Sequence, residues 1–122
     1  MIPKPEPRKR IKARAKRAEG KVKGSVRAQC VERDGYCRFV QAQTVLGKCD
    51  GPSEWAHALQ RFRTRGMAPE ARHQTATSMI LCQAHHFALD KGTGADRLKV
   101  NPLTDDGLDG PVYAIRNGQA WE

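Results

Sequence analysis

The chain has 122 residues, of which 39% are hydrophobic and 6% aromatic, so it has room for one small domain with a modest core. No apolar run approaches the roughly 18 residues that a membrane-spanning helix needs, and the amino-terminal residues lack the apolar region of a secretory signal. We therefore expect no membrane insertion and a reducing cytoplasmic compartment, in which clustered cysteines bind metal more often than they form disulfides.

The net charge of +9 is concentrated near the amino terminus. Residues 1–24 contain ten Lys or Arg and two Glu, whereas residues 25–122 contain twelve Lys or Arg and eleven Asp or Glu. Three prolines near the start exclude regular structure there, and Gly20 and Gly24 interrupt the helix that the composition of residues 11–19 favours. We predict a basic, flexible and partly disordered arm that attracts nucleic acid, with a solubilising tail as the alternative.

Turn residues and hydrophobic periodicity predict the elements that follow. We expect a short helix over 26–33 capped by Ser25, a loop or irregular hairpin over 36–49, a strand over 54–59, a polar loop over 60–76, an apolar strand or helix entry over 79–81, a helix over 83–90, and strands over 97–100 and 111–116. Asn117-Gly118 predicts a turn. The fold class is therefore α+β, with a β extension over 96–117.

Four residues have the chemistry of a structural zinc site, which takes Cys or His ligands in a tetrahedron. Cys82 and His85 are three residues apart at the predicted start of a helix, which is typical of a ligand pair. Cys37 and Cys49 complete the set if the segment between them loops out. Cys30 could replace one member, but its position in an apolar helical stretch suits a packed thiol better.

A second group of residues suits chemistry on a phosphodiester. His86 and Asp90 are four residues apart on one helical face and could hold a divalent ion, although such a pair can also be a surface contact. His57 lies in the predicted strand, where a hydrogen-bonded structural His is the alternative to a general base that works near neutral pH. Guanidinium groups position phosphates, and three follow His57: Arg61, Arg63 and Arg65.

In their order and spacing these pieces resemble the HNH endonucleases, of the small kind found in phages and bacteria. The matching segments are Val31-Glu32-Arg33-Asp34-Gly35-Tyr36-Cys37, Cys49, Glu54-Trp55-Ala56-His57, Met79-Ile80-Leu81-Cys82-Gln83-Ala84-His85-His86 and Leu89-Asp90. The match covers about residues 25–92, with a motif core at 31–92 inside a nuclease domain of residues 25–122. The resemblance implies a treble-clef-like ββα-metal fold that is stabilised by zinc.

The resemblance also implies roles. His57 falls at the general base, and His86 and Asp90 fall at ligands of a catalytic divalent ion such as Mg²⁺ or Mn²⁺. The structural zinc set is Cys37, Cys49, Cys82 and His85. DNA is the implied partner, together with other DNA-processing proteins and without a small-molecule substrate, in a bacterial or phage-infected cell.

Two positions depart from the HNH pattern. Ala56 stands where members carry a metal-binding Asp, Glu or His. Either Asp90, or Glu54 if the strand bends, would supply the missing ligand, or water would fill an open coordination position, because hard divalent ions keep waters readily. Thr77 stands where members carry the Asn that orients the base. Three residues are candidates for that orienting role: Thr77, Ser78 and His73.

These departures leave a second function open. A DNA-binding module that zinc stabilises, with a degenerate and inactive HNH site, would explain both Ala56 and Thr77. A protein-binding adaptor is a third hypothesis, which the nearly neutral residues 25–122 favour, but it explains neither His57 nor His86.

Overall fold

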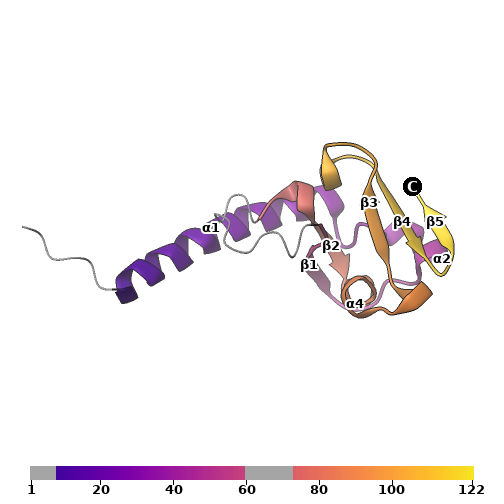
Figure 1. Cartoon of the computed structure of the whole chain (residues 1–122), viewed down its shortest axis with the longest axis horizontal. Coiled ribbons are helices and arrows are strands. Elements are labelled where there is room, and N and C mark those ends of the chain that lie inside the picture. The colour runs from indigo at the N-terminus through magenta and orange to yellow at the C-terminus, as the bar shows by residue number, and fades with distance from the viewer. Residues whose placement is uncertain (1–7, 60–72) are drawn as a thin grey trace, which may run out of the picture.

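The computed structural model describes residues 8–59 and 73–122 as an α+β fold with two antiparallel sheets (Figure 1). Its main elements are α1 (Arg8–Asp34), α2 (Gln43–Leu46), β1 (Ser53–His57), β2 (Ser78–Cys82), α4 (Gln83–Lys91), β3 (Lys99–Pro102), β4 (Val112–Arg116) and β5 (Gln119–Trp121). The predicted α+β class is therefore confirmed. No helix within the described residues is long and apolar enough to cross a membrane.

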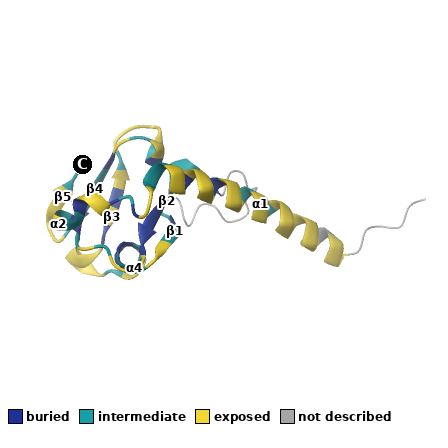
Figure 2. Ribbon diagram, turned by 180° about the vertical axis from the view of Figure 1, so that it is seen from behind, coloured by how far each residue is buried: buried dark blue, intermediate teal, exposed yellow. Residues whose placement is uncertain are grey.

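Helix α1 runs through Gly20 and Gly24 without interruption, so the predicted break at these residues is wrong. It is about 40 Å long at 1.5 Å per residue. Its first half projects away from the sheets and its second half packs on them (Figures 1 and 2). Each glycine costs roughly 1 kcal/mol in a helix, and the burial of Val26 and Cys30 against the sheet offsets that cost. The arm boundary at residue 24 stays a prediction, and residues 1–7 lie outside the described range.

The middle of the segment between α1 and β1 is helical. The sequence predicts a loop or irregular hairpin for residues 36–49, but the structure has a 3-10 turn at Val40–Ala42 that leads into α2. Core packing overrides the β propensity of this segment, because the helical turns bury Phe39 and Leu46 completely. Gly47 follows α2 with a φ of 98°, a backbone conformation that favours glycine.

Strands β1 and β2 form a sheet that separates two hydrophobic clusters. Trp55 pairs with Ile80, and both pack against α1. Ala56 pairs with Met79, and both belong to the larger cluster, which includes α4. Because successive strand residues point to opposite faces, β1 has one face toward α1 and one toward α4. β2 is buried along its whole length (Figure 2).

The carboxyl-terminal residues form a three-stranded antiparallel sheet. The two strands predicted there are present as β3 and β4, and β5 adds a third strand that the sequence did not predict. β3 ends at Pro102, two residues beyond the strand predicted over 97–100. Asn117 and Gly118 have φ values of 53° and 76° and form the two-residue hairpin turn before β5, which confirms the predicted turn. Trp121 packs edge-on against Phe39, with ring centroids 5.6 Å apart.

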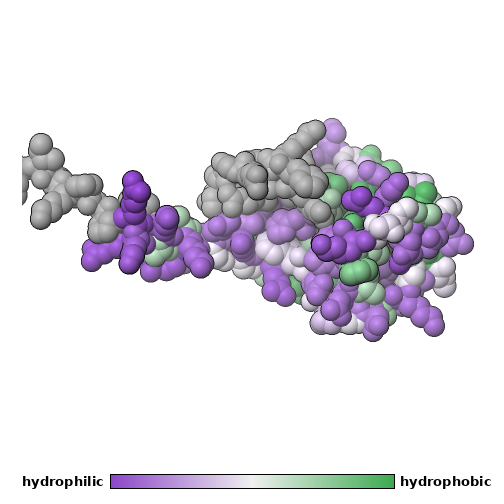
Figure 3. All heavy atoms as spheres, turned by 60° about the horizontal axis from the view of Figure 1, so that its bottom comes forward, coloured by the Kyte–Doolittle hydropathy of each residue, from purple (hydrophilic) through white to green (hydrophobic). Residues whose placement is uncertain are grey.

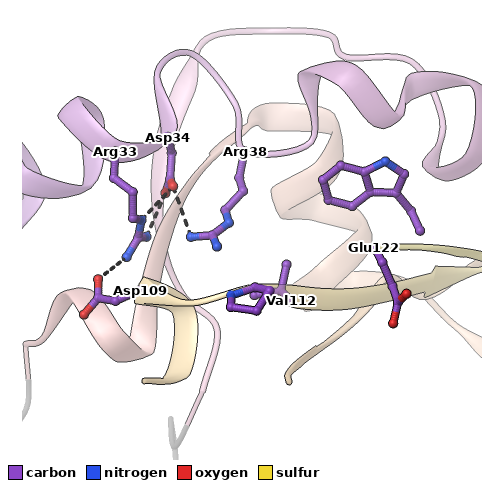
Figure 4. Close-up of a pocket in the computed structure, with 8 residues that line it drawn as sticks. Arg33, Asp34, Arg38, Asp109, Val112 and Glu122 are labelled. Atoms are coloured by element: carbon purple, nitrogen blue, oxygen red, sulfur yellow. Dashed lines mark hydrogen bonds and ion pairs between the residues drawn. The ribbon is translucent and has the colours of Figure 1, made fainter. Parts of the chain in front are cut away.

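A buried ion cluster fastens the end of α1 to the rest of the fold (Figure 4). The Asp34 side chain is 1% exposed. It accepts hydrogen bonds from Arg33 (2.7 and 2.8 Å), Arg38 (3.2 Å) and the backbone N–H of Ile80 (2.9 Å). Arg33 also donates to Asp109 at 2.8 Å. The cluster positions the chain just before Cys37, the first predicted zinc ligand.

Candidate metal centre and active site

Four side chains meet at the start of α4 in a cluster that could hold a metal ion: Cys37, Cys49, Cys82 and His85. Their ligand atoms all lie within 4.8 Å of one another. The His85 Nδ1 atom is 3.4, 3.6 and 3.1 Å from the Sγ atoms of Cys37, Cys49 and Cys82. The predicted set of four is therefore confirmed as a cluster. Cys30 lies on α1 in the other hydrophobic cluster, where it packs with Val26 and Ile80, as expected for a packed thiol.

The spacing of these atoms fits zinc. Zn–S bonds of about 2.3 Å and Zn–N bonds of about 2.0–2.1 Å place sulfur and nitrogen about 3.5 Å apart along a tetrahedral edge. The observed separations of 3.1 to 3.6 Å are close to that value. Three thiols and an imidazole are also the soft donors that zinc prefers over harder cations. The residues present thus suit a structural zinc ion.

Surrounding contacts orient the ligands. The Nε2 atom of His85 lies 2.9 Å from the carbonyl oxygen of Gly47, which can only accept, so Nε2 carries the proton and Nδ1 directs its lone pair toward the sulfurs. Cys82 caps α4, because its sulfur accepts the backbone N–H of His85 at 3.4 Å. The first two N–H groups of the helix, those of Gln83 and Ala84, donate to the carbonyls of Pro52 and Asp50 at 2.9 and 3.0 Å. The first turn of α4 is therefore tied to the loop that carries Cys49.

Burial sets the charge of the cluster in the absence of a cation. It raises the pKa of Cys37, and burial together with the neighbouring Cys37 raises the pKa of Cys49 from 9.0 to about 12. Burial lowers the pKa of His85. These three groups are therefore uncharged near neutral pH without a metal, and a bound ion would have to displace the thiol protons.

His86, the next residue of α4, lies between two carboxylates. Its Nδ1 atom is 2.8 Å from Glu54 Oε1, and its Nε2 atom is 3.0 Å from Asp90 Oδ2. The structure thus brings Asp90 to His86, as their spacing predicts. It also brings Glu54, which shares the α4 face of β1 with Ala56 and reaches His86 from a regularly paired strand, without the bend that we expected to be necessary. Strand alternation in the sequence is the signal that identifies Glu54.

The two carboxylates constrain what His86 can do. A neutral imidazole has one N–H and can satisfy only one of them, so the other contact calls for a cation, either a second proton or a metal ion. The two carboxylates approach different nitrogens of the ring. A metal ion bound to one of these nitrogens would therefore also bind the carboxylate on that side. Carboxylate and imidazole donors suit divalent ions such as Mn²⁺. The three side chains line a pocket of about 240 Å³ together with Gln83, Phe87 and Lys91.

His57, the predicted general base, is the last residue of β1 and lies on the face of the strand opposite to Glu54. It shares the α1 face with Trp55, and their ring centroids are 4.4 Å apart. At about 3.3 Å per residue, it lies roughly 10 Å along the strand from Glu54. The structure therefore places His57 and His86 on different sides of the sheet.

Of the three candidates for orienting His57, only His73 has a side-chain contact with it among the described interactions: His57 Nε2 is 3.0 Å from His73 Nδ1. Thr77 contributes its backbone carbonyl, which accepts the N–H groups of both residues that follow His57, at 3.0 and 3.1 Å. The Ser78 hydroxyl donates to the carbonyl of Gln74 at 2.7 Å. The predicted phosphate-binding residues lie outside the described residues: Arg61, Arg63 and Arg65.

Comparison with known proteins gives no further assignment. The chain matches no protein-family model, no curated protein and no solved structure.

Proposed function

We propose that the protein is a metal-dependent DNA endonuclease or nickase of the HNH kind, in which a structural zinc ion stabilises the fold. The adjacent histidines at the start of α4 carry the proposal. His85 belongs to the cluster with three cysteines, and His86 faces two carboxylates. A domain that used zinc only to stabilise its fold would have no need for this second site beside the first.

The order of the elements supports the same function. β1 and β2 pair in antiparallel fashion, and α4 begins directly after β2. His57 ends the first strand, the four-residue cluster lies at the start of the helix, and His86 and Asp90 follow within it. These are the positions that the resemblance to HNH endonucleases implies for base, zinc and catalytic ion.

The proposed reaction is hydrolysis of a phosphodiester. His57 accepts a proton from water as the water attacks phosphorus. His86, with Asp90 or Glu54, would hold a divalent ion, which supplies positive charge at the phosphate and the leaving oxygen. Lys91 is exposed at the same pocket and adds a charge that attracts the phosphate backbone.

The charge of α1 supports DNA as the substrate. Residues 8–31 contain ten Lys or Arg and one Glu. Figure 3 shows hydrophilic side chains gathered on the projecting half of this helix. A rigid basic helix can follow a phosphate backbone and release counterions, which gives affinity without sequence preference.

One observation favours a second candidate function. Because His57 and His86 lie on opposite faces of the sheet, a single phosphodiester can meet both only by passing around the outer edge or the end of β1. If it does not, the same features describe a DNA-binding module that zinc stabilises, in which the residues around His86 do not catalyse hydrolysis.

Nicking of supercoiled plasmid tests the proposal. We expect the zinc-loaded protein to nick DNA with Mg²⁺ or Mn²⁺ and EDTA to stop the reaction. His57→Ala should lower the rate by about 100-fold or more, the usual contribution of a general base. His86→Ala should also lower the rate, because the divalent ion would lose a ligand. Asp105→Asn, which changes an exposed carboxylate outside both histidine sites, should nick DNA like the parent.

DNA binding by fluorescence anisotropy, measured on the same preparations, separates the two candidate functions. Binding by the parent without cleavage in any divalent ion would overturn the nuclease and leave the binding module. A His57→Ala variant that nicks at the parental rate would show that another group is the base.

A further inference from the structure

Three polar side chains form a chain of contacts from α1 to the end of β1. Glu19 Oε1 lies 3.0 Å from His73 Nε2, and His73 Nδ1 lies 3.0 Å from His57 Nε2. His73 is 6% exposed, so the middle of the chain is buried. The Trp55 ring packs against both imidazoles, with centroids 4.4 and 5.7 Å away. Glu19 and His73 are 54 residues apart in the sequence, so their contact is a product of the fold.

Glu19 is an exception in the basic part of its helix. It is the single acidic residue among residues 8–31, which contain ten basic ones. Lys23, one turn later, lies 3.9 Å from its carboxylate, and such a surface pair is worth only a few tenths of a kcal/mol. That pair does not account for the contact between the Glu19 carboxylate and a buried imidazole.

Hydrogen-bonding rules place the protons in this chain. A carboxylate can only accept, so the Nε2 atom of His73 donates to Glu19. The Nδ1 atom of neutral His73 is then unprotonated and can only accept, so the Nε2 atom of His57 must carry a proton. Neutral His57 therefore has its lone pair on Nδ1.

We infer that Glu19 and His73 are positioning residues that hold His57 with Nε2 protonated and with Nδ1 as the nitrogen that accepts a proton from water. The reaction rests on the proposed function, whereas the position of the proton is a property of the chain that can be measured without DNA. The inference also gives α1 two roles, because the helix that attracts DNA carries the carboxylate that orients the base.

¹⁵N NMR of the imidazole rings tests the inference. The spectra are recorded at a pH high enough that the ring signals no longer change with pH. In the parent we expect both His57 and His73 to be protonated at Nε2. Glu19→Gln keeps an acceptor oxygen and should keep this pattern. Glu19→Lys replaces the acceptor by a donor, so the proton of His73 should move to Nδ1 and that of His57 should move to Nδ1 as well. Glu32→Lys makes the same charge change on an exposed residue of α1 and should leave the pattern unchanged.

Single-turnover nicking at saturating DNA gives the second measurement. Glu19→Lys should be slower by about 100-fold, because His57 no longer has its lone pair on Nδ1, while Glu19→Gln and Glu32→Lys stay near the parental rate. Circular dichroism confirms that each variant is folded. The inference is wrong if Glu19→Lys leaves His57 protonated at Nε2. It is also wrong if the proton of His57 moves to Nδ1 and the reaction is not slower. A parent with the expected protons that never nicks DNA would refute the nuclease and support the positioning of His57.

Discussion

Glu54 Oε1 lies 2.8 Å from the Nδ1 atom of His86, and this contact joins β1 to α4. The contact puts a carboxylate next to the catalytic-site candidate even though Ala56 lacks one. The departure of Ala56 from the HNH pattern therefore does not leave His86 without an acidic neighbour from β1.

Glu54→Gln should weaken the binding of Mn²⁺ to the zinc-loaded protein by about 10- to 100-fold, since the loss of even an outer partner of a metal ligand has effects of that size. Glutamine keeps the length of the side chain and removes its charge. Calorimetric titration measures the change, with Asp105→Asn as the control for the loss of one negative charge. Unchanged affinity in Glu54→Gln would assign the ion to the Nε2 atom of His86 and to Asp90.

Metal analysis should find one zinc ion per chain in freshly reduced protein. Cys82→Ser should lose the zinc and melt at a lower temperature, because binding of a structural zinc ion contributes directly to folding. Cys30→Ser is the matched control, since Cys30 is equally buried but lies outside the cluster. A parent without zinc would contradict the assignment of the metal centre.

Zinc affinity should fall as the pH is lowered. Burial raises the pKa of Cys37 and raises that of Cys49 to about 12, so both thiols hold protons that zinc must displace. The lowered pKa of His85 means that its imidazole is already neutral and releases none. Each displaced proton changes the apparent zinc affinity by about tenfold per pH unit. These two thiols alone should therefore change that affinity by about 100-fold per pH unit. Competition with a chromophoric chelator between about pH 6 and pH 8 measures the slope, and a flat profile would show that the thiols are ionised without zinc.

Asp34→Asn should lower the free energy of unfolding by roughly 3 kcal/mol. This value lies toward the lower end of the cost of breaking a buried ion pair, because Arg33 and Arg38 keep partial contact with water. The substitution keeps the shape of the side chain and leaves two guanidinium groups without their carboxylate. Urea unfolding of the zinc-loaded protein measures the effect at constant m-value. Asp105→Asn, on the surface, should stay within about 0.5 kcal/mol of the parent.

The salt dependence of DNA binding should reveal the contribution of α1. Lys9, Lys12 and Lys16 are exposed on one side of the helix. Replacing all three by Gln should reduce the slope of log K against log salt by about 0.9 for each phosphate that is no longer neutralised, or about 2.7 in total. Lys99→Gln, on β3, is the control and should leave the slope unchanged. An unchanged slope in the triple variant would place the DNA elsewhere on the molecule.

The sequence predicted the features whose cause is local. The spacing of Cys82 and His85 at a helix start, and the turn at Asn117-Gly118, depend on residues a few positions apart, so periodicity and turn chemistry identify them. Ligand chemistry added Cys37 and Cys49, because a zinc site needs four donors and the sequence has few. Local propensity failed at Gly24, where packing of the neighbouring Val22 and Val26 outweighs the cost of a glycine in a helix.

Tertiary structure alone decided which side chains of different segments meet. Strand alternation shows that Glu54 and His57 point to opposite faces, but only the packing of α4 and α1 on those faces brings His86 to one and His73 to the other. Nothing within one helical turn of Glu19 indicates a buried imidazole 54 residues away. The sequence by itself thus determined the residue types of both sites and the metal cluster. The path of the chain determined the partners of each histidine, because contacts between distant segments depend on the packing of whole elements.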